Sequence, residues 1–263
     1  MLISELYTTS QGLHLFRPPY QSVRPIPVEW LPGPDMPRGE AVVWCMRGTV
    51  QSMDECSALE ERRHGVPLIV ILPPPVEIAG VRDCLRRIDQ LRPKGVLPHV
   101  DIDAVGALRS VLYAPPVRVG QSLAGYLTGR GFLNDDTIRG YVSQIFDAAP
   151  QVRSVSKLSS MLCMSRRTLG RHFATAGLPV PSHWLQFARL LHAVFQLQHN
   201  GPSVFHVACR LGYPDGFTMS NQMKRVLGIR PSEIRGVLGW EWIVERWLRR
   251  ERCAVPTMIH VKG

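Results

Sequence analysis

Residues 154–177 read SVSKLSSMLCMSRRTLGRHFATAG, and a similar stretch returns at residues 203–228 as SVFHVACRLGYPDGFTMSNQMKRVLG. In each stretch the apolar positions predict two short helices around a tight turn, which is the spacing of a helix-turn-helix unit. The first turn falls at residues 163–165, and Ser165 is expected to cap the helix that follows it. The second turn has one extra residue, near Pro214 and Asp215. The chain is therefore expected to hold two helix-turn-helix units.

Corresponding positions in the two stretches support the repeat. The pairs that correspond are Leu158 and Val207, Ser159 and Ala208, Leu162 and Leu211, and Phe173 and Met223. The residues expected to face the core of the first unit are Val155, Leu158, Met161, Leu162, Leu169, His172 and Phe173. Because the pairing shifts by one residue across the turn, the units are expected to share a core pattern and to differ in turn length.

Two further amphipathic helices are expected beside the units. One covers residues 182–199, and its apolar stripe holds Trp184, Leu185, Ala188, Leu191 and Phe195. The other follows the acidic pair Asp135 and Asp136, and its stripe holds Ile138, Tyr141, Val142, Ile145 and Phe146. A rigid helix between the two units could place both recognition helices in successive major-groove segments, about 34 Å apart.

The positive charge of the chain lies in the same half. Residues 151–263 hold 16 Lys and Arg against 5 Asp and Glu, a net charge of +11. Residues 1–150 hold 15 against 16, a net charge of −1. Neutralising phosphates releases counterions, so this asymmetry favours a polyanion as the partner of the C-terminal half. Nucleic acid and an anionic membrane surface are the first candidates.

The second helix of each unit supplies the candidate DNA contacts. Arg166, Arg167 and Arg171 follow the Ser165 cap and are expected to point outward, where arginine can bind guanine O6 and N7 with two hydrogen bonds. A solvated basic face, or contacts to phosphates alone, is the alternative. The predicted DNA-binding residues are Ser165, Arg166, Arg167, Thr168, Arg171, Gly216, Phe217, Thr218, Asn221, Gln222, Lys224 and Arg225. The first unit is expected to read sequence more strongly, because Lys224 and Arg225 lie near the far end of their helix, where phosphate is the target.

The stretch 211–235, LGYPDGFTMSNQMKRVLGIRPSEIR, resembles the signature of the AraC/XylS family of bacterial transcription regulators. The positions that match are Gly212, Tyr213, Ser220, Lys224, Arg225, Gly228, Pro231 and Arg235. The segments SRRTLGRHF at 165–173 and ARLLHA at 188–193 are similar to the first unit and to the linking helix of the family. The resemblance spans about residues 135–236, and it implies a regulator that binds double-stranded DNA.

The chain departs from the family pattern at several positions. Cys163 stands where a turn glycine is usual, and Met219 and Met223 stand where aromatic core residues are usual. Asn221 replaces an arginine that commonly reaches DNA, which predicts weaker base contact by the second unit. A cupin-like sugar-binding barrel, the usual N-terminal partner, is not expected, because residues 41–114 do not alternate in the manner of a β-barrel.

The N-terminal half predicts an α/β domain. A Pro- and Gly-rich stretch at 18–39, with at most a short strand at 28–31, precedes expected strands at 41–46, 66–72 and 94–100. Helices are expected between and after them, at 52–65, 76–93 and 101–114. The expected apolar stripes are Val76, Ile78, Val81, Leu85, Ile88 and Leu91 in one helix and Ile102, Val105, Leu108, Val111 and Leu112 in another. Short apolar runs between amphipathic helices favour parallel strands with crossover helices.

Residues 41–114 resemble a truncated, flavodoxin-like response-regulator receiver domain; any small βα sheet would produce the same pattern, and that alternative stays open. The resemblance lacks the receiver's chemistry. Cys45, Met46 and Arg47 stand where the phosphoacceptor Asp would be, Leu72 and Pro73 stand where Ser or Thr would be, and His99 stands near the place of the lysine. The acidic pair that holds Mg²⁺ has no equivalent in LHLFRPP at 13–19. Dimerisation or sensing without phosphorylation is the expected role.

Other functions find little support in the sequence. Six scattered cysteines form no CxxC pair, and His206 with Cys209 lacks further ligands nearby, so no metal site is expected. The nucleotide-binding patterns GxGxxG and GxxxxGK[ST], a nucleophile elbow and a catalytic triad are all missing, so no cofactor and no catalysis are expected. No stretch reaches the roughly 18 apolar residues of a membrane span, and no signal peptide is recognisable, which favours a cytoplasmic protein.

The predicted organisation is an α/β N-terminal domain followed by an all-α double helix-turn-helix domain. The expected boundaries are 1–125 for the α/β domain, 126–150 for a connecting region with the first helix, 151–236 for the DNA-binding domain and 237–263 for a basic amphipathic helix and tail. The expected function is sequence-specific DNA binding by a homodimer, with RNA polymerase as a further partner. An adaptor that docks its helical domain on another protein is the alternative, and an enzyme in the α/β domain is a third reading.

Overall fold

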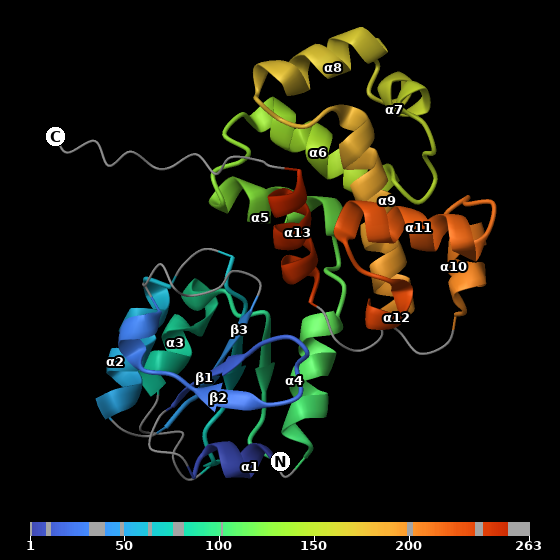
Figure 1. The fold of residues 1–263 in the computed structure, drawn as a ribbon. Coiled ribbons are helices and arrows are strands. Elements are labelled where there is room, and N and C mark those ends of the chain that lie inside the picture. Colours follow the sequence, from blue (N-terminus) through green and yellow to red (C-terminus); the bar gives the residue numbers. More distant parts are fainter. Residues whose placement is uncertain are drawn as a thin grey trace, which may run out of the picture. The chain divides into compact units, whose positions relative to one another are not determined.

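The computed structural model describes residues 2–8, 12–31, 40–47, 50–62, 65–75, 82–100, 102–198, 202–234 and 239–251. The chain divides into two compact units (Figure 1). The first comprises residues 1–114 with 236–242, and the second comprises residues 115–235 with 243–263. The change of unit after residue 114 lies ahead of the expected boundary at 125, because a helix at 119–129 belongs to the second unit.

The first unit is built on a five-stranded mixed sheet in the order β2-β1-β3-β4-β5. The strands are β1 (Leu13–Phe16), β2 (Val23–Pro25), β3 (Ala41–Cys45), β4 (Leu68–Ile71) and β5 (Gly95–Leu97). β3, β4 and β5 are parallel, as the apolar runs predicted, with Val43 opposite Ile69 and Val70 opposite Val96. Every residue of β3 and β4 is buried, because helices cover both faces of the sheet.

Each face of the sheet has its own core. α2 (Val50–Glu60) and α3 (Arg82–Leu91) cover one face, where Leu59 and Leu91 pack with Trp44 and Val70. α1 (Ile3–Leu6) and α4 (Ala104–Tyr113) cover the other, where Leu108 and its neighbours pack on alternate strand residues. The expected helices at 52–65, 76–93 and 101–114 are therefore present as α2, α3 and α4.

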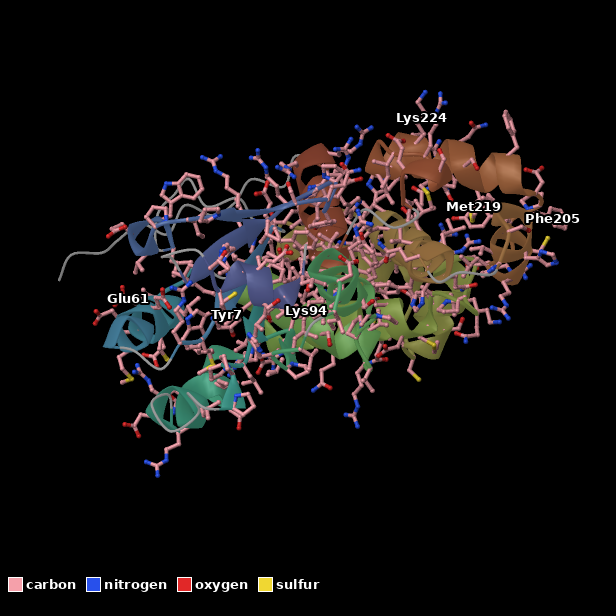
Figure 2. The ribbon with its side chains drawn as sticks, turned by 90° about the horizontal axis from the view of Figure 1, so that it is seen from below. Tyr7, Glu61, Lys94, Phe205, Met219 and Lys224 are labelled. Carbon is pink, nitrogen blue, oxygen red and sulfur yellow. The ribbon has the colours of Figure 1, made fainter. Side chains whose placement is uncertain are left out.

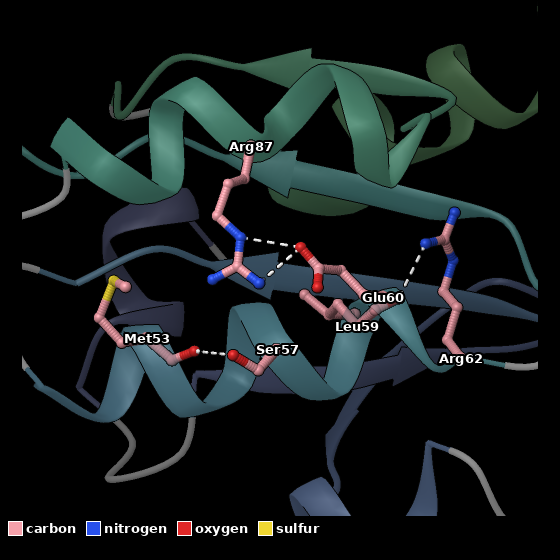
Figure 3. Close-up of polar contacts among 6 residues, drawn as sticks. All are labelled: Met53, Ser57, Leu59, Glu60, Arg62 and Arg87. Atoms are coloured by element: carbon pink, nitrogen blue, oxygen red, sulfur yellow. Dashed lines mark hydrogen bonds and ion pairs between the residues drawn. The ribbon is translucent and has the colours of Figure 1, made fainter.

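Polar contacts join α2 to α3 and join both helices to Arg62, which follows α2 (Figure 3). Arg87 Nε on α3 donates to Glu60 Oε1 on α2 at 2.8 Å. Arg62 donates to the Leu59 carbonyl at 3.0 Å and to the Leu91 carbonyl at 2.5 Å, so it binds the last residues of both helices. Burial lowers the pKa of Arg62 to about 10, which leaves the guanidinium charged at neutral pH.

Two expectations in this unit differ from the structure, and part of a third lies outside the described residues. Residues 28–30 form the 3₁₀ helix η1 (Val28–Trp30) instead of a strand; it follows Pro27, whose extended backbone serves as the N-cap. Ile102 is 42% exposed because it precedes α4, whose buried face begins at Ala104. Val76, Ile78 and Val81 of the expected stripe lie outside the described residues, whereas Leu85 and Ile88 pack against the core and Leu91 is buried.

The receiver-like resemblance is not confirmed by the sheet. Its strand order matches the 2-1-3-4-5 order of flavodoxin-like folds, in which the strands are parallel. Here β1 is antiparallel to both of its neighbours, with Leu15 opposite Arg24 on β2 and opposite Val42 on β3. The structure supports an α/β unit with a mixed sheet.

The elements described in the second unit are helices. They are α5 (Val119–Gly129), α6 (Asp136–Ala148), α7 (Val155–Met161), α8 (Arg166–Thr175), α9 (Pro181–Gln198), α10 (Val204–Arg210), α11 (Gly216–Leu227), α12 (Pro231–Ile234) and most of α13 (Trp240–Arg250). The helix expected after Asp135 is α6, and the Asp135 carboxylate caps it by accepting a hydrogen bond from the Ile138 amide at 2.9 Å. α5 was not predicted as a separate helix.

The core of the second unit surrounds α9. The predicted stripe is buried, and further residues of this helix are buried as well, because α6, α7, α8, α10 and α12 all contact it. The Phe187 ring stacks on Trp247 of α13, with 4.2 Å between centroids, and Trp184 lies edge-on to the same ring. One buried helix thus contacts both helices of the first helix-turn-helix unit and the first helix of the second.

A buried ion pair ties α13 to α5 within the same unit. Arg130 Nη2 donates to Glu245 Oε2 at 3.1 Å, and the Tyr126 hydroxyl donates to Glu245 Oε1 at 2.8 Å. Both charged side chains are less than a tenth exposed, and each supplies the partner that a buried charge requires. The expected packing of the C-terminal helix against the helix-turn-helix core is confirmed by the buried positions Ile243, Val244, Trp247 and Leu248.

Candidate nucleic-acid interface

The first helix-turn-helix unit consists of α7 and α8. Ser154 Oγ caps α7 by accepting a hydrogen bond from the Lys157 amide at 3.2 Å. Ser165 Oγ caps α8 by accepting from the Thr168 amide at 3.0 Å, and it also bonds to the Thr168 hydroxyl at 2.8 Å. The predicted cap is therefore confirmed, and two of the predicted contact residues have a local structural role as well.

The turn between α7 and α8 places Cys163 in the left-handed region, with φ of +53°. This conformation favours glycine, because the Cβ of any other residue crowds the following carbonyl. The Cys163 amide donates to the Ser160 carbonyl at 3.1 Å, and the next amide donates to Ser159. Cys163 thus occupies the glycine position of the turn, where the sequence departs from the family pattern.

α8 presents its arginines to solvent. Arg166, Arg167 and Arg171 are exposed, while Leu169 and Phe173 on the opposite face are fully buried. The prediction that Met161 faces the core is wrong. Its side chain is 44% exposed, because it is the last residue of α7 and lies off the buried face that Leu158 and Ser159 form. The remaining predicted core residues, Val155, Leu162 and His172, are half-buried.

The second helix-turn-helix unit consists of α10 and α11. Ser203 caps α10 through the His206 amide at 3.2 Å, and Asp215 caps α11 through the Thr218 amide at 2.6 Å. The left-handed residue of this turn is Gly212, with φ of +72°, directly after the C-cap Leu211. In both units the left-handed residue follows the C-cap, and the second turn has one residue more before its N-cap, as predicted.

The predicted residues of α11 occupy two kinds of position. Exposed side chains belong to Phe217, Thr218, Asn221, Lys224 and Arg225, and Lys224 points outward from the helix in Figure 2. Gly216 and Gln222 are half-buried. Gln222 Oε1 accepts a hydrogen bond from the Tyr213 hydroxyl, so its carbonyl oxygen is bound to the turn.

Two arginines outside α10 and α11 lie against the second turn. Arg189 on α9 donates to the Leu211 carbonyl at 2.6 Å, and its guanidinium lies 4.5 Å from the centroid of the Tyr213 ring. Arg153, just before α7, lies so close to Gly212 that a Cβ added there would be 2.1 Å from Arg153 Nε. Arg189 falls in the segment that resembles the linking helix of the family, whereas Arg153 carried no signal in the sequence.

The end of α11 is bound by α13. Arg246 donates to the Leu227 carbonyl at 2.7 Å and to the Gly228 carbonyl at 3.2 Å, and Arg250 donates to the Arg225 carbonyl at 2.8 Å. The last carbonyls of a helix have no partner within it, so the guanidinium groups satisfy them and oppose the negative end of the helix dipole. These contacts join segments far apart in the sequence, and the sequence reasoning missed them.

Three of the histidines described in this unit bond to protein groups. His192 bonds to the Phe146 carbonyl at 2.8 Å, His206 to Ser203 Oγ at 2.8 Å and His183 to Glu251 at 2.9 Å. No group of three or more His, Cys, Asp or Glu among the described residues could hold a metal ion. Within the same residues, no helix has both the length and the apolar character needed to cross a bilayer.

Part of the helical unit is similar to known proteins. An AraC-type regulator domain from Chromobacterium violaceum is 22% identical with a TM-score of 0.34, and covers 38% of this chain and 94% of its own. The DNA-binding domain of AdpA, a global transcriptional factor solved with a target DNA, is 26% identical with a TM-score of 0.32, and covers 43% and 92%. No curated protein matches the chain. Residues 158–236 match the family model of the helix-turn-helix domain, and with the signature at 211–235 this makes them a helix-turn-helix domain of the AraC type.

Proposed function

We propose that the helical unit binds double-stranded DNA and that the chain is a sequence-specific transcription regulator. The observation that carries this proposal is the pair of helix-turn-helix units around one buried helix, each with a capped, outward-facing second helix. The net charge of +11 on residues 151–263 supports a polyanionic partner. The family match at 158–236 supports DNA as that polyanion.

In this proposal α8 reads bases in the major groove. Recognition helices place their N-terminal residues against base edges, and the exposed Arg166, Arg167 and Arg171 lie in the first two turns of α8. A guanidinium donates two parallel hydrogen bonds to guanine, which fixes the base as well as the position. Thr168, fixed through the Ser165 cap, would orient the helix start without adding charge.

The second unit binds the phosphate backbone at the far end of α11. Lys224 and Arg225 are exposed in the last turn of this helix, which lies away from the helix start that faces the base edges. Arg189 and Arg153 hold the turn of this unit against parts of the chain that adjoin the first unit. In this proposal these contacts favour one spacing of the two contact surfaces before binding, which lowers the ordering cost of engaging both.

The test is selection of bound sequences from a random duplex pool, followed by affinity measurements over a salt series. The proposal expects an enriched sequence and an affinity that falls steeply with added salt for every duplex, because phosphate contacts release counterions. If no sequence is enriched after selection, and no duplex binds more tightly than another, sequence-specific binding is rejected. Capture of RNA polymerase by a chain that binds no duplex would favour the adaptor function instead.

We also propose that the α/β unit, residues 1–114 with 236–242, serves self-association and accepts no phosphoryl group. β3 ends in Cys45, which is fully buried, and burial raises the pKa of its thiol to about 12, so neither a carboxylate nor a reactive thiolate stands at this strand end. His99 packs edge-on to Tyr7, with 4.7 Å between ring centroids. An aspartyl phosphate in residues 41–103 after treatment with acetyl phosphate would contradict the second part. A full-length chain that scatters light as a monomer at high concentration would contradict the first.

A further inference from the structure

Phe217 has the most exposed aromatic side chain among the residues that the structure describes, with 76% of its surface accessible. It lies in the first turn of α11, two residues after the N-cap Asp215. A phenyl ring in water at such a position stabilises nothing in the unit itself, because apolar surface contributes only when it is buried. The start of the second recognition helix therefore carries an apolar group that a partner would cover.

The backbone around Phe217 is held firmly. The Asp215 carboxylate accepts a hydrogen bond from the Thr218 amide at 2.6 Å, which fixes the residues on both sides of Phe217. A Cβ added at Gly216 would lie 3.4 Å from the Phe205 amide nitrogen and 3.4 Å from Val204 Cγ1, so α11 starts in close contact with α10. The direction of the Phe217 side chain is thus set by the unit, and it points away from the buried residues Met219 and Met223.

The chemistry of the ring restricts what it could recognise in DNA. A phenyl group has no donor or acceptor for the polar edges of the bases. In the major groove the apolar group that a base presents is the 5-methyl of thymine, and phenylalanine is one of the side chains that contact it. Resting on the proposed function, we propose that Phe217 makes the second unit select thymine, through apolar contact with the 5-methyl group.

This assignment separates two functions within α11. Phe217 at the start of the helix reads a methyl group, and Lys224 near its end binds phosphate. The second unit would then read sequence without the bidentate arginine contacts of the first. A wedge that inserts between base steps would be a different use of the ring, since such wedges enter from the minor groove and depend on unstacking instead of a methyl group.

The test uses the full chain and its selected duplex, in which each thymine is replaced in turn by deoxyuridine. The replacement removes one methyl group and leaves base pairing and hydrogen-bond groups unchanged. At one or two thymines in the half that the second unit protects, affinity is expected to fall about fourfold per methyl. Phe217→Ala is expected to bind the thymine and uracil duplexes equally, while Phe217→Leu keeps part of the difference. Phe205→Ala is the matched control, because Phe205 is also exposed, at 57%, but lies on α10; it is expected to keep the full difference.

Each outcome decides the proposal. Equal binding of the thymine and uracil duplexes by the unmodified chain would overturn it and leave the proposed function intact. A thymine preference that persists in Phe217→Ala would also overturn it, because another residue would then read the methyl. Recovery of affinity when a cytosine at the same position is changed to 5-methylcytosine would support it. A chain that prefers no duplex at all would instead reject the proposed function on which the inference rests.

Discussion

The two helix-turn-helix units share a scaffold but are stabilised in different ways. The first closes α8 with its own backbone, since the Gly177 amide donates to the Ala174 carbonyl at 3.0 Å and the Leu178 amide donates to the Phe173 carbonyl at 2.9 Å. The second has a backbone bond at this end as well, from the Gly228 amide to the Lys224 carbonyl at 2.9 Å, but arginines of distant segments also bind its turn and the end of α11. The first also presents three exposed arginines, whereas the second presents a phenyl ring and a basic end. A repeated sequence thus specifies the same backbone while the contacts around it diverge.

The largest effects on stability are expected in the cores. Phe173→Ala removes a buried ring that lies 6.3 Å from Trp184, and should lower the free energy of unfolding by about 3–5 kcal/mol. Met223→Ala, at the corresponding buried position, should cost about 2–5 kcal/mol and less than Phe173→Ala, because the side chain that is removed is smaller and more flexible than a phenyl ring. Urea unfolding of both variants measures the two costs. A larger loss for Met223→Ala than for Phe173→Ala would contradict this order.

The turns should respond in opposite directions. Gly212→Ala is expected to destabilise the unit by about 1–3 kcal/mol, because a Cβ there is strained and meets Arg153. Cys163→Gly relieves a left-handed residue that costs about 1–2 kcal/mol. Glycine also loses more conformational entropy on folding, which offsets about 0.5–1 kcal/mol of this gain. The variant should therefore be as stable as the unmodified protein or slightly more stable. Thermal melts of the two variants give the comparison, and a loss for Cys163→Gly as large as that for Gly212→Ala would count against it.

Removing the hydrogen bonds of Arg246 to the end of α11 should affect the second helix-turn-helix unit alone. Arg246→Ala leaves the Leu227 and Gly228 carbonyls without their guanidinium partner, and is expected to cost about 1–2 kcal/mol. Hydrogen exchange should quicken in the last turn of α11 and stay unchanged in α8. Arg249→Ala is the control, because Arg249 is exposed on the same helix. Equal effects on α8 and α11 would show that α13 supports the whole domain and is not specific to the second unit.

The smallest difference is expected at the caps. The hydrogen bond from the Thr218 amide lowers the pKa of Asp215, so the folded second unit favours the ionised cap. The ionised cap contributes fully to stability above the ordinary Asp pKa of about 3.9, and this contribution is lost as the pH falls through the lowered pKa of Asp215. The first unit is capped by Ser165, which does not titrate in this range. In an NMR titration the Thr218 amide should shift in acid while the Thr168 amide does not, and Asp215→Ser should abolish the shift at Thr218.

Local sequence predicted much of this site. The spacing of Leu158, Leu169 and Phe173 identified a buried face, and the residues opposite it are exposed as a helical period requires. The cap at Ser165 was predicted, and the same local reasoning could have predicted the cap at Asp215, since capping depends on residues three apart. The spacing of the repeat even predicted the longer second turn.

Long-range contacts were beyond the same reasoning. Nothing near Gly212 indicates that Arg153 would pack on it, and nothing near Leu227 indicates Arg246, because these partners meet only in the folded unit. The direction of β1 was hidden for a similar reason: LHLF fits a strand in either direction, and pairing with Ala41–Cys45 decides it. Fully buried runs such as LIVI identify a strand and its burial but leave its neighbours open.

The most direct test of base reading by the first helix-turn-helix unit is the affinity of Arg167→Ala, Arg171→Ala and Lys224→Ala for the selected duplex and for a scrambled duplex across a salt series. At least one arginine variant should lose about 1–3 kcal/mol on the selected duplex and much less on the scrambled one, relaxing preference at one or two base pairs. Lys224→Ala should weaken both duplexes alike and flatten the salt slope by about one unit. Equal proportional losses on both duplexes for both arginine variants would contradict base reading by the first unit.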